Sequence, residues 1–208
     1  MSQAWIIAES AFLGALLGPR PFFRDTRTLY AELESPEEGQ LRQGIDRVVR
    51  HAQVPQRLDI DFHWDATFAS HVAGLADLGR SRILLPMSML GHGERCAAAL
   101  AHEVAHHVLV LHGKAVSARI LSRLKDTPAA LQELERLTDL TVFQLGLGAL
   151  LLSGVYWQAV DGSLARGGYL SDDELRHAFL EYAQRERLTG SELDSQLSPN
   201  GRRLMLGR

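Results

Sequence analysis

Residues 140 to 160 carry no charged side chain, and this run restricts what the chain can fold into more than any other feature. A run of this length can span a bilayer as one helix. However, Gln144, Ser153 and Gln158 interrupt it, and its first turns continue a helix that bears acidic residues. We therefore expect a buried element of a globular domain, followed by a break near Gly154. Membrane association through residues 140 to 160 stays open as the alternative.

The sequence H-E-x-x-H lies in a second apolar run, from residue 94 to residue 111. Residues four apart on an α-helix share a face, so His102 and His106 can both reach one metal ion. In the known use of this motif the two histidines bind zinc, and the glutamate, here Glu103, takes a proton from the water that zinc holds. Burying these polar groups in an apolar helix is costly unless something binds them. The motif therefore predicts a hydrolase that depends on Zn²⁺, rather than two core histidines held by hydrogen bonds.

A third zinc ligand is needed, and His112 is the first candidate. It follows His102 by ten residues and matches the last histidine of the metzincin pattern H-E-x-x-H-x-x-G-x-x-H. The glycine of that pattern lets the chain turn out of the helix, but this chain has Leu109 at that position. We expect the helix to continue and to carry His112 away from the metal. A metzincin-like site that uses His112 is kept as an alternative.

The second candidate lies on a downstream helix, which Thr127 and Pro128 begin as an N-cap and a first-turn proline. Glu135 and Asp139 are four residues apart on this helix and therefore share a face. The residues around this pair are apolar: Leu134, Leu137, Leu140 and Val142. The two carboxylates are therefore poorly placed for contact with water.

H-E-x-x-H followed by E-x-x-x-D on a second helix resembles the gluzincin clan of zinc peptidases. The resemblance implies that Glu135 is the third zinc ligand beside His102 and His106. It also implies that Asp139 orients one ligand histidine. A ligand imidazole usually gives its other ring N–H to a carboxylate or carbonyl, which fixes its tautomer.

The resemblance covers roughly residues 82 to 177. Within this range G-Y-L-S at residues 168 to 171 is similar to small bacterial relatives of the gluzincins. Two features depart from the clan pattern. Thr138 stands where many gluzincins have alanine, and His107 doubles the second ligand histidine. The choice of His106 as the ligand therefore depends on the four-residue spacing.

Capping boxes and alternating patterns predict further elements: a helix from 35 to 52, strands at 58–63, 73–76 and 82–86, and a helix from 171 to 187. After Thr189 the chain turns polar, and a turn is expected at 198–201. We expect a mainly helical α+β fold of the zincin-like type, with a small sheet beside a two-helix zinc-binding core. The expected domains are an N-terminal helical segment (1–55), the metallopeptidase domain (56–188) and a C-terminal tail (189–208).

Composition agrees with a globular domain that has a real core, because 46% of the 208 residues are hydrophobic and 23% are charged. A net charge of -3 gives no footprint for nucleic acid. The single cysteine, Cys96, excludes an internal disulfide. No Lys or Arg precedes the apolar part of residues 1 to 18, and Glu9 interrupts it, so we expect no secretory signal and a cytoplasmic protein.

These features predict a zinc metallopeptidase that hydrolyses a peptide or protein substrate. Glu103 is expected to act as the general base. An exposed sheet edge beside the zinc is expected to take up an extended peptide as another strand. Tyr169 and His177 are candidate hydrogen-bond donors to the oxyanion of the transition state.

The alternative function is a latent or non-catalytic zinc-binding module that acts through a regulatory protein partner. Such a module has no need of a general base, and this chain keeps Glu103. We therefore expect an active zinc metalloendopeptidase.

Overall fold

Helices make up most of the part of the chain that the computed structural model describes, namely residues 3–52, 61–65, 74–77, 82–122, 127–158 and 162–207. The helices are α1 (Gln3–Leu17), α2 (Thr26–Glu34), α3 (Glu38–His51), α4 (Gly93–Leu111), α5 (Gly113–Leu121), α6 (Thr127–Gln144), α7 (Gly148–Gly154), α8 (Asp172–Arg185), α9 (Gly190–Gln196) and α10 (Pro199–Leu206). The strands are β1 (Asp61–Asp65), β2 (Leu75–Asp77), β3 (Arg82–Pro86), β4 (Tyr156–Gln158) and β5 (Leu164–Arg166), and a short 3₁₀ turn (Met87–Met89) follows β3. The fold is mainly helical and of the α+β class, as predicted.

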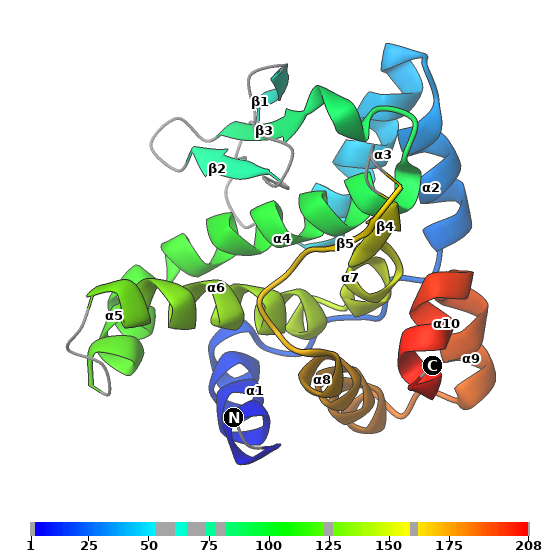
Figure 1. Ribbon diagram of the computed structural model, residues 1–208. Coiled ribbons are helices and arrows are strands. Elements are labelled where there is room, and N and C mark those ends of the chain that lie inside the picture. The colour runs from blue at the N-terminus through cyan, green and yellow to red at the C-terminus, as the bar shows by residue number, and fades with distance from the viewer. Residues whose placement is uncertain are drawn as a thin grey trace.

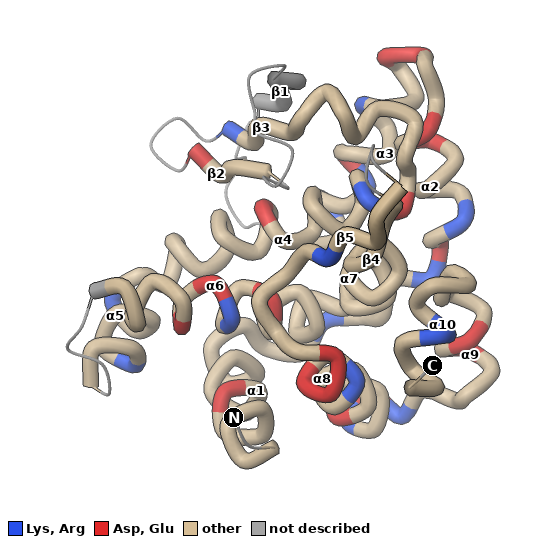
Figure 2. The backbone as a smooth tube through the Cα atoms, in the orientation of Figure 1, with Lys and Arg blue, Asp and Glu red and all other residues tan. Residues whose placement is uncertain are grey.

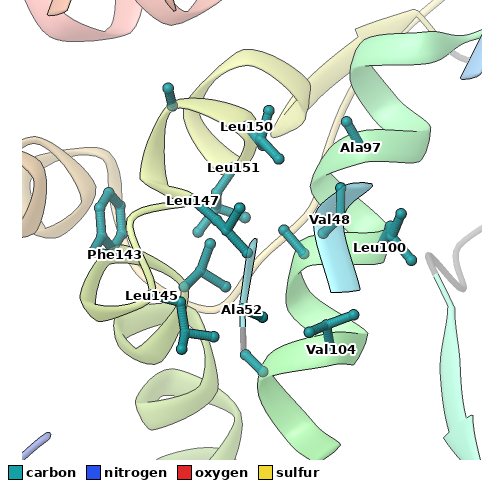
Figure 3. Packing of buried hydrophobic residues seen from close by; sticks show 14 of the residues in the cluster. Val48, Ala52, Ala97, Leu100, Val104, Phe143, Leu145, Leu147, Leu150 and Leu151 are labelled. Carbon is teal, nitrogen blue, oxygen red and sulfur yellow. The ribbon is translucent and has the colours of Figure 1, made fainter. Parts of the chain in front are cut away.

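Helix α4 lies at the centre of the fold because apolar residues cover most of its surface (Figure 1). Small residues bring its neighbours close: a Cβ atom on Gly154 of α7 would lie 2.2 Å from the carbonyl oxygen of Glu94 and 2.6 Å from Cβ of Ala98. Figure 3 shows Leu100 and Val104 of α4 in one packed cluster with residues of α3, α6, α7 and the turn between α6 and α7, among them Val48, Phe143, Leu147 and Leu151. Helix α6 also packs along α4, so the two helices that carry the sequence motifs are neighbours.

The uncharged run from 140 to 160 forms the end of α6, a turn and α7, and then enters β4. Every residue from 140 to 154 is buried, and the break after Gly154 is confirmed. A second break, which the sequence did not predict, lies at Gly146. The backbone of Gly146 has φ +76°, and a Cβ atom there would lie 2.0 Å from the carbonyl oxygen of Pro21. Among the described residues no helix is both long and apolar enough to cross a membrane.

A small mixed sheet covers one side of α4 (Figure 1). Its strand order is β1-β3-β2, with β1 parallel and β2 antiparallel to β3. The strand predicted at 82–86 is confirmed as β3, and the one predicted at 73–76 forms at Leu75–Asp77, with Ala73 outside the described residues. The strand predicted at 58–63 overlaps β1 from residue 61 onward, and residues 58–60 lie outside the described residues.

The chain after residue 154 differs from the predicted pattern in three places, one of which is helix α9, where only a polar stretch was expected. A hairpin of β4 and β5, which was not predicted, pairs Tyr156 with Arg166. The helix predicted from residue 171 is confirmed, including its capping box. The turn predicted at 198–201 is wrong: Ser198 accepts a hydrogen bond from the N–H of Gly201 and begins α10, with proline in the first turn. Helix α10 packs against α7 and α8.

The N-terminal helix α1 is tied to the rest of the protein by an ion pair. The side chain of Glu9 is fully buried, and its carboxylate accepts hydrogen bonds of 2.9 and 3.1 Å from the guanidinium of Arg119 on α5. Elsewhere basic and acidic residues are interspersed along the helices, and Figure 2 shows no broad face of one sign in that view.

Candidate metal centre

Three side chains from α4 and α6 converge at the place where these helices face one another. The Nε2 atoms of His102 and His106 are 3.1 Å apart. The Oε2 atom of Glu135 lies 3.2 Å from Nε2 of His102 and 3.1 Å from Nε2 of His106. The three atoms therefore form a nearly equilateral triangle, built from one pair of residues four apart on α4 and one residue of α6.

The size of this triangle fits a zinc ion. A tetrahedral zinc ion binds nitrogen and oxygen ligands at about 2.0–2.1 Å, so neighbouring ligand atoms lie about 3.3 Å apart. The three measured distances are within about 0.2 Å of this value. Within the described part of the chain, these residues are the group of His, Cys, Asp and Glu side chains that could hold a metal ion.

The second ring nitrogen of His102 is held by Asp139. Its Nδ1 atom lies 2.8 Å from Oδ1 of the fully buried Asp139 side chain. The other carboxylate oxygen, Oδ2, accepts hydrogen bonds from the backbone N–H groups of Tyr169 and Leu170. Because Asp139 accepts at Oδ1, the proton of a neutral His102 ring lies on Nδ1 and the lone pair of Nε2 points into the triangle.

Gly168 explains how the loop after β5 can approach Asp139. Its backbone has φ +77°, and a Cβ atom there would lie 3.2 Å from Oδ2 of Asp139. Residues 168 to 170 therefore wrap the carboxylate with main-chain atoms. This is the physical role of the glycine in the G-Y-L-S sequence.

Thr138 fixes the tautomer of His106 in the same way. The Thr138 hydroxyl donates its proton to the carbonyl oxygen of Leu134 at 2.9 Å, and its oxygen lies 3.3 Å from Nδ1 of His106. A hydroxyl has one proton, so towards His106 this oxygen acts as an acceptor and Nδ1 carries the ring proton. The lone pair of His106 Nε2 then also points into the triangle. The sequence showed Thr138 only as a departure from the gluzincin pattern, although its place three residues after Glu135 put it on the same face.

Two nitrogen lone pairs and a carboxylate oxygen this close together repel one another unless a proton or a metal ion lies between them. Burial by itself would lower the pKa of His102, but its hydrogen bonds to Asp139 and Glu135 outweigh burial and raise this pKa to about 10. Burial likewise raises the pKa of Glu135, yet hydrogen bonds to the two histidines bring it down to about 2. The neighbours that raise the pKa of His102 and lower the pKa of Glu135 would also favour a metal ion at the same place.

Glu103 lies beside the triangle and is not part of it. Its side chain is buried, and burial raises the pKa of its carboxyl, while His102 and His106 lower it. The carboxylate accepts a hydrogen bond from the backbone N–H of Ala76 on β2. Gly74 makes this approach possible, because a Cβ atom there would lie 2.7 Å from Oε1 of Glu103.

A cavity of about 320 Å³ opens beside the triangle of His102, His106 and Glu135. His102 and Glu103 line one end of it, and Arg95 and Trp157 line another part of its wall. The ring of Tyr169 stacks on His102 with centroids 5.8 Å apart and planes inclined by 22°. Tyr169 is half-exposed and also lines the cavity, so it is near enough to contact a bound ligand.

Three histidines considered in the sequence lie away from the triangle. His112 follows the last residue of α4, about 9 Å along the helix axis from His106. His177 lies on α8 and does not line the cavity. His107 is buried against the sheet, where it hydrogen-bonds the backbone of Arg82. The four-residue spacing thus selected the histidine that faces Glu135.

A scan of protein-family models, a search of curated proteins and a search of solved structures each found no match to this chain.

Proposed function

We propose that this chain is a zinc-dependent metallopeptidase with a zincin-like core of the gluzincin type. The observation that carries the proposal is the triangle of His102 Nε2, His106 Nε2 and Glu135 Oε2, whose sides of 3.1 to 3.2 Å suit one tetrahedral ion. Three protein ligands leave a fourth position open, which is the arrangement of catalytic zinc sites. The supporting contacts of Asp139 and Thr138 are what ligand histidines require.

The reaction assigned to the site is hydrolysis of a peptide bond. A zinc ion held by His102, His106 and Glu135 would act as a Lewis acid, which lowers the pKa of a bound water to about 7 and polarises a carbonyl group. The carboxylate of Glu103 accepts one proton from the attacking water and then gives it to the amine nitrogen that leaves. The oxygen of the water stays on the acyl product, and the C–N bond breaks. The burial that raises the pKa of Glu103 makes this carboxylate a better proton acceptor.

Strand β2 and Tyr169 are proposed to position the substrate. In the described sheet β2 pairs with β3 alone, and its N–H group at Ala76 holds the general base. An extended peptide that pairs with the other side of β2 would run past Glu103. The Tyr169 hydroxyl is the candidate donor to the oxyanion, because its ring lies against His102 and lines the cavity.

The test is cleavage of a peptide library by protein that was purified without added zinc, with metal content measured on the same sample. We expect about one zinc per chain and cleavage products in the mass spectra. Glu103→Gln should keep the zinc and lose cleavage, because Glu103 acts on the water and not on the ion. Glu38→Gln, on an exposed face of α3, is the matched control and should change neither. A zinc-loaded wild-type protein that cleaves nothing contradicts the proposal.

A further inference from the structure

Helix α4 lines the cavity with one continuous face. Arg95, Ala98, Ala99, His102 and Glu103 follow one another at three- and four-residue spacing, and all of them line the cavity. The two alanines leave room between the metal triangle and Arg95. Seven or eight residues of helix correspond to about 10 to 12 Å along its axis. An extended peptide rises about 3.3 Å per residue, so about three residues span this distance.

Arg95 has no anionic partner within the described part of the chain. Its guanidinium carbon lies 4.4 Å from the centroid of the Trp157 ring, and its Nε is buried without a hydrogen-bond partner. Burial lowers the pKa of this guanidinium, and no carboxylate raises it. Glu34 and Glu94 line a neighbouring hollow together with Arg95, but neither forms an ion pair with it. A partly buried cation with only an aromatic ring as partner is costly to hold unless a ligand completes it.

Arg166, the other cation in the cavity wall, has an anionic partner and several hydrogen-bond acceptors. It pairs with Asp172 and donates hydrogen bonds to the carbonyl oxygens of Gly167 and Gly168. Its donors therefore serve to hold the loop that reaches Asp139. Arg95 is the cation of this wall that is left for a ligand.

The guanidinium of Arg95 is well separated from the triangle of His102, His106 and Glu135. Glu103 and Asp139 line the end near the metal triangle, and the guanidinium of Arg95 lies two helical turns away. A carboxylate on a bound peptide is attracted by the guanidinium at the end of the cavity away from the triangle. Trp157 keeps the guanidinium plane in place, and Gly167 lets the tryptophan ring lie close to the backbone, because a Cβ atom there would be 3.0 Å from it.

We propose that Arg95 binds a carboxylate of the substrate about three residues from the scissile bond. This inference rests on the proposed peptidase function. The carboxylate is either the free C-terminus of a peptide or an acidic side chain, and both present the same planar pair of oxygens that a guanidinium binds with two hydrogen bonds.

The test measures binding to the zinc-loaded Glu103→Gln protein, which does not depend on catalysis. The probes are acetyl-Ala-Ala-Ala with a free carboxylate or as its amide, and acetyl-Ala-Ala-Glu-amide or its Gln counterpart. In at least one of the two pairs, we expect the peptide with the carboxylate to bind about tenfold more tightly, or more, than its neutral counterpart. Hydrogen bonds between charged groups allow a difference of this size. The first pair reports on a C-terminal carboxylate, and the second pair reports on an acidic side chain. NMR of the Arg95 Nε–H group should show a shift with the carboxylate form alone.

Arg95→Met, added to the Glu103→Gln protein, should remove the preference for the carboxylate peptides. Arg95→Lys in the same protein should keep part of this preference. Arg42→Met, which removes an exposed arginine on α3, is the control for net charge and should leave the preference intact. Thermal melting of each variant checks that it is folded. Equal affinity for acids and amides in both pairs, or a preference that survives Arg95→Met, overturns the inference. Cleavage of the peptide library by the wild-type protein is read separately, so a failure of the peptidase proposal is told apart from a failure at Arg95.

Discussion

The hydroxyl proton of Thr138 determines the tautomer of His106, and therefore which ring nitrogen is free to bind a metal ion. Thr138 donates to the Leu134 carbonyl and accepts from His106. Thr138→Val keeps the shape and removes the acceptor, whereas Thr138→Ser keeps the acceptor. We expect the valine variant to lose zinc affinity by about 10-fold or more, as for other residues that support metal ligands, and the serine variant to lose less. Competition with a coloured chelator measures both, and equal affinities in all three proteins would contradict this role.

Asp139 should matter more because both of its oxygens are used. Asp139→Asn places an amide NH₂ against either the ring N–H of His102 or the N–H groups of Tyr169 and Leu170. A donor then faces a donor. We expect zinc affinity or turnover to fall by about 10- to 100-fold while the protein still folds. Unchanged affinity together with an unchanged rate would mean that the carboxylate is not needed for the site.

The identity of the third ligand is tested by comparing two alanine variants. Glu135→Ala removes one of the three proposed ligand atoms and should release most of the zinc from protein purified without added metal. His112→Ala should retain it, because His112 lies beyond the end of α4. Metal analysis of the two purified proteins gives the answer. The reverse result would favour the metzincin-like alternative.

At the scale of elements, the distance between β2 and α4 determines where Glu103 can lie. In Gly74→Ala the new methyl group would lie 2.7 Å from Oε1 and 3.0 Å from Cγ of Glu103, so strand or carboxylate must move. We expect hydrolysis to fall and zinc content to stay the same, since no metal ligand is touched. Gly39→Ala on α3 meets open space and is the matched control. A Gly74→Ala protein with full activity would show that Glu103 tolerates the shift.

The elements that the sequence predicted are those with strong local patterns. The apolar run with H-E-x-x-H gives α4, and helical spacing places His102 and His106 on one face of it. Helical spacing also places Glu135 and Asp139 on one face of α6, but the choice of Glu135 over His112 as the third member came from the resemblance to the gluzincins. The break at Gly146 was missed because the Pro21 carbonyl, more than a hundred residues away, requires the glycine there. Ser198 was assigned to a turn because a serine followed by proline is equally typical of a turn and of a helix start. In the structure, burial of Leu204 against the core favours the helix.

At the scale of the whole molecule, zinc would cross-link α4 and α6, which are separated in the sequence by α5. A ligand that binds only the folded state stabilises it by about 2.7 kcal/mol at a free concentration 100 times its Kd. We therefore expect the Tm to rise with zinc and to fall with a chelator. The Glu135→Ala protein should melt at a temperature that zinc does not change. A wild-type Tm independent of zinc would argue against a metal centre between α4 and α6.

The two oxygens of Asp139 couple zinc binding at the proposed metal site to peptide binding in the cavity. One oxygen orients a ligand of the ion, and the other holds the loop that carries Tyr169. If a bound peptide stabilises the hydrogen bonds between this loop and Asp139, it must raise the affinity for zinc by the same factor by which zinc raises the affinity for the peptide. A chelator should therefore remove zinc more slowly or less completely when the cavity is filled. Metal retention then becomes a measure of substrate binding that needs no turnover.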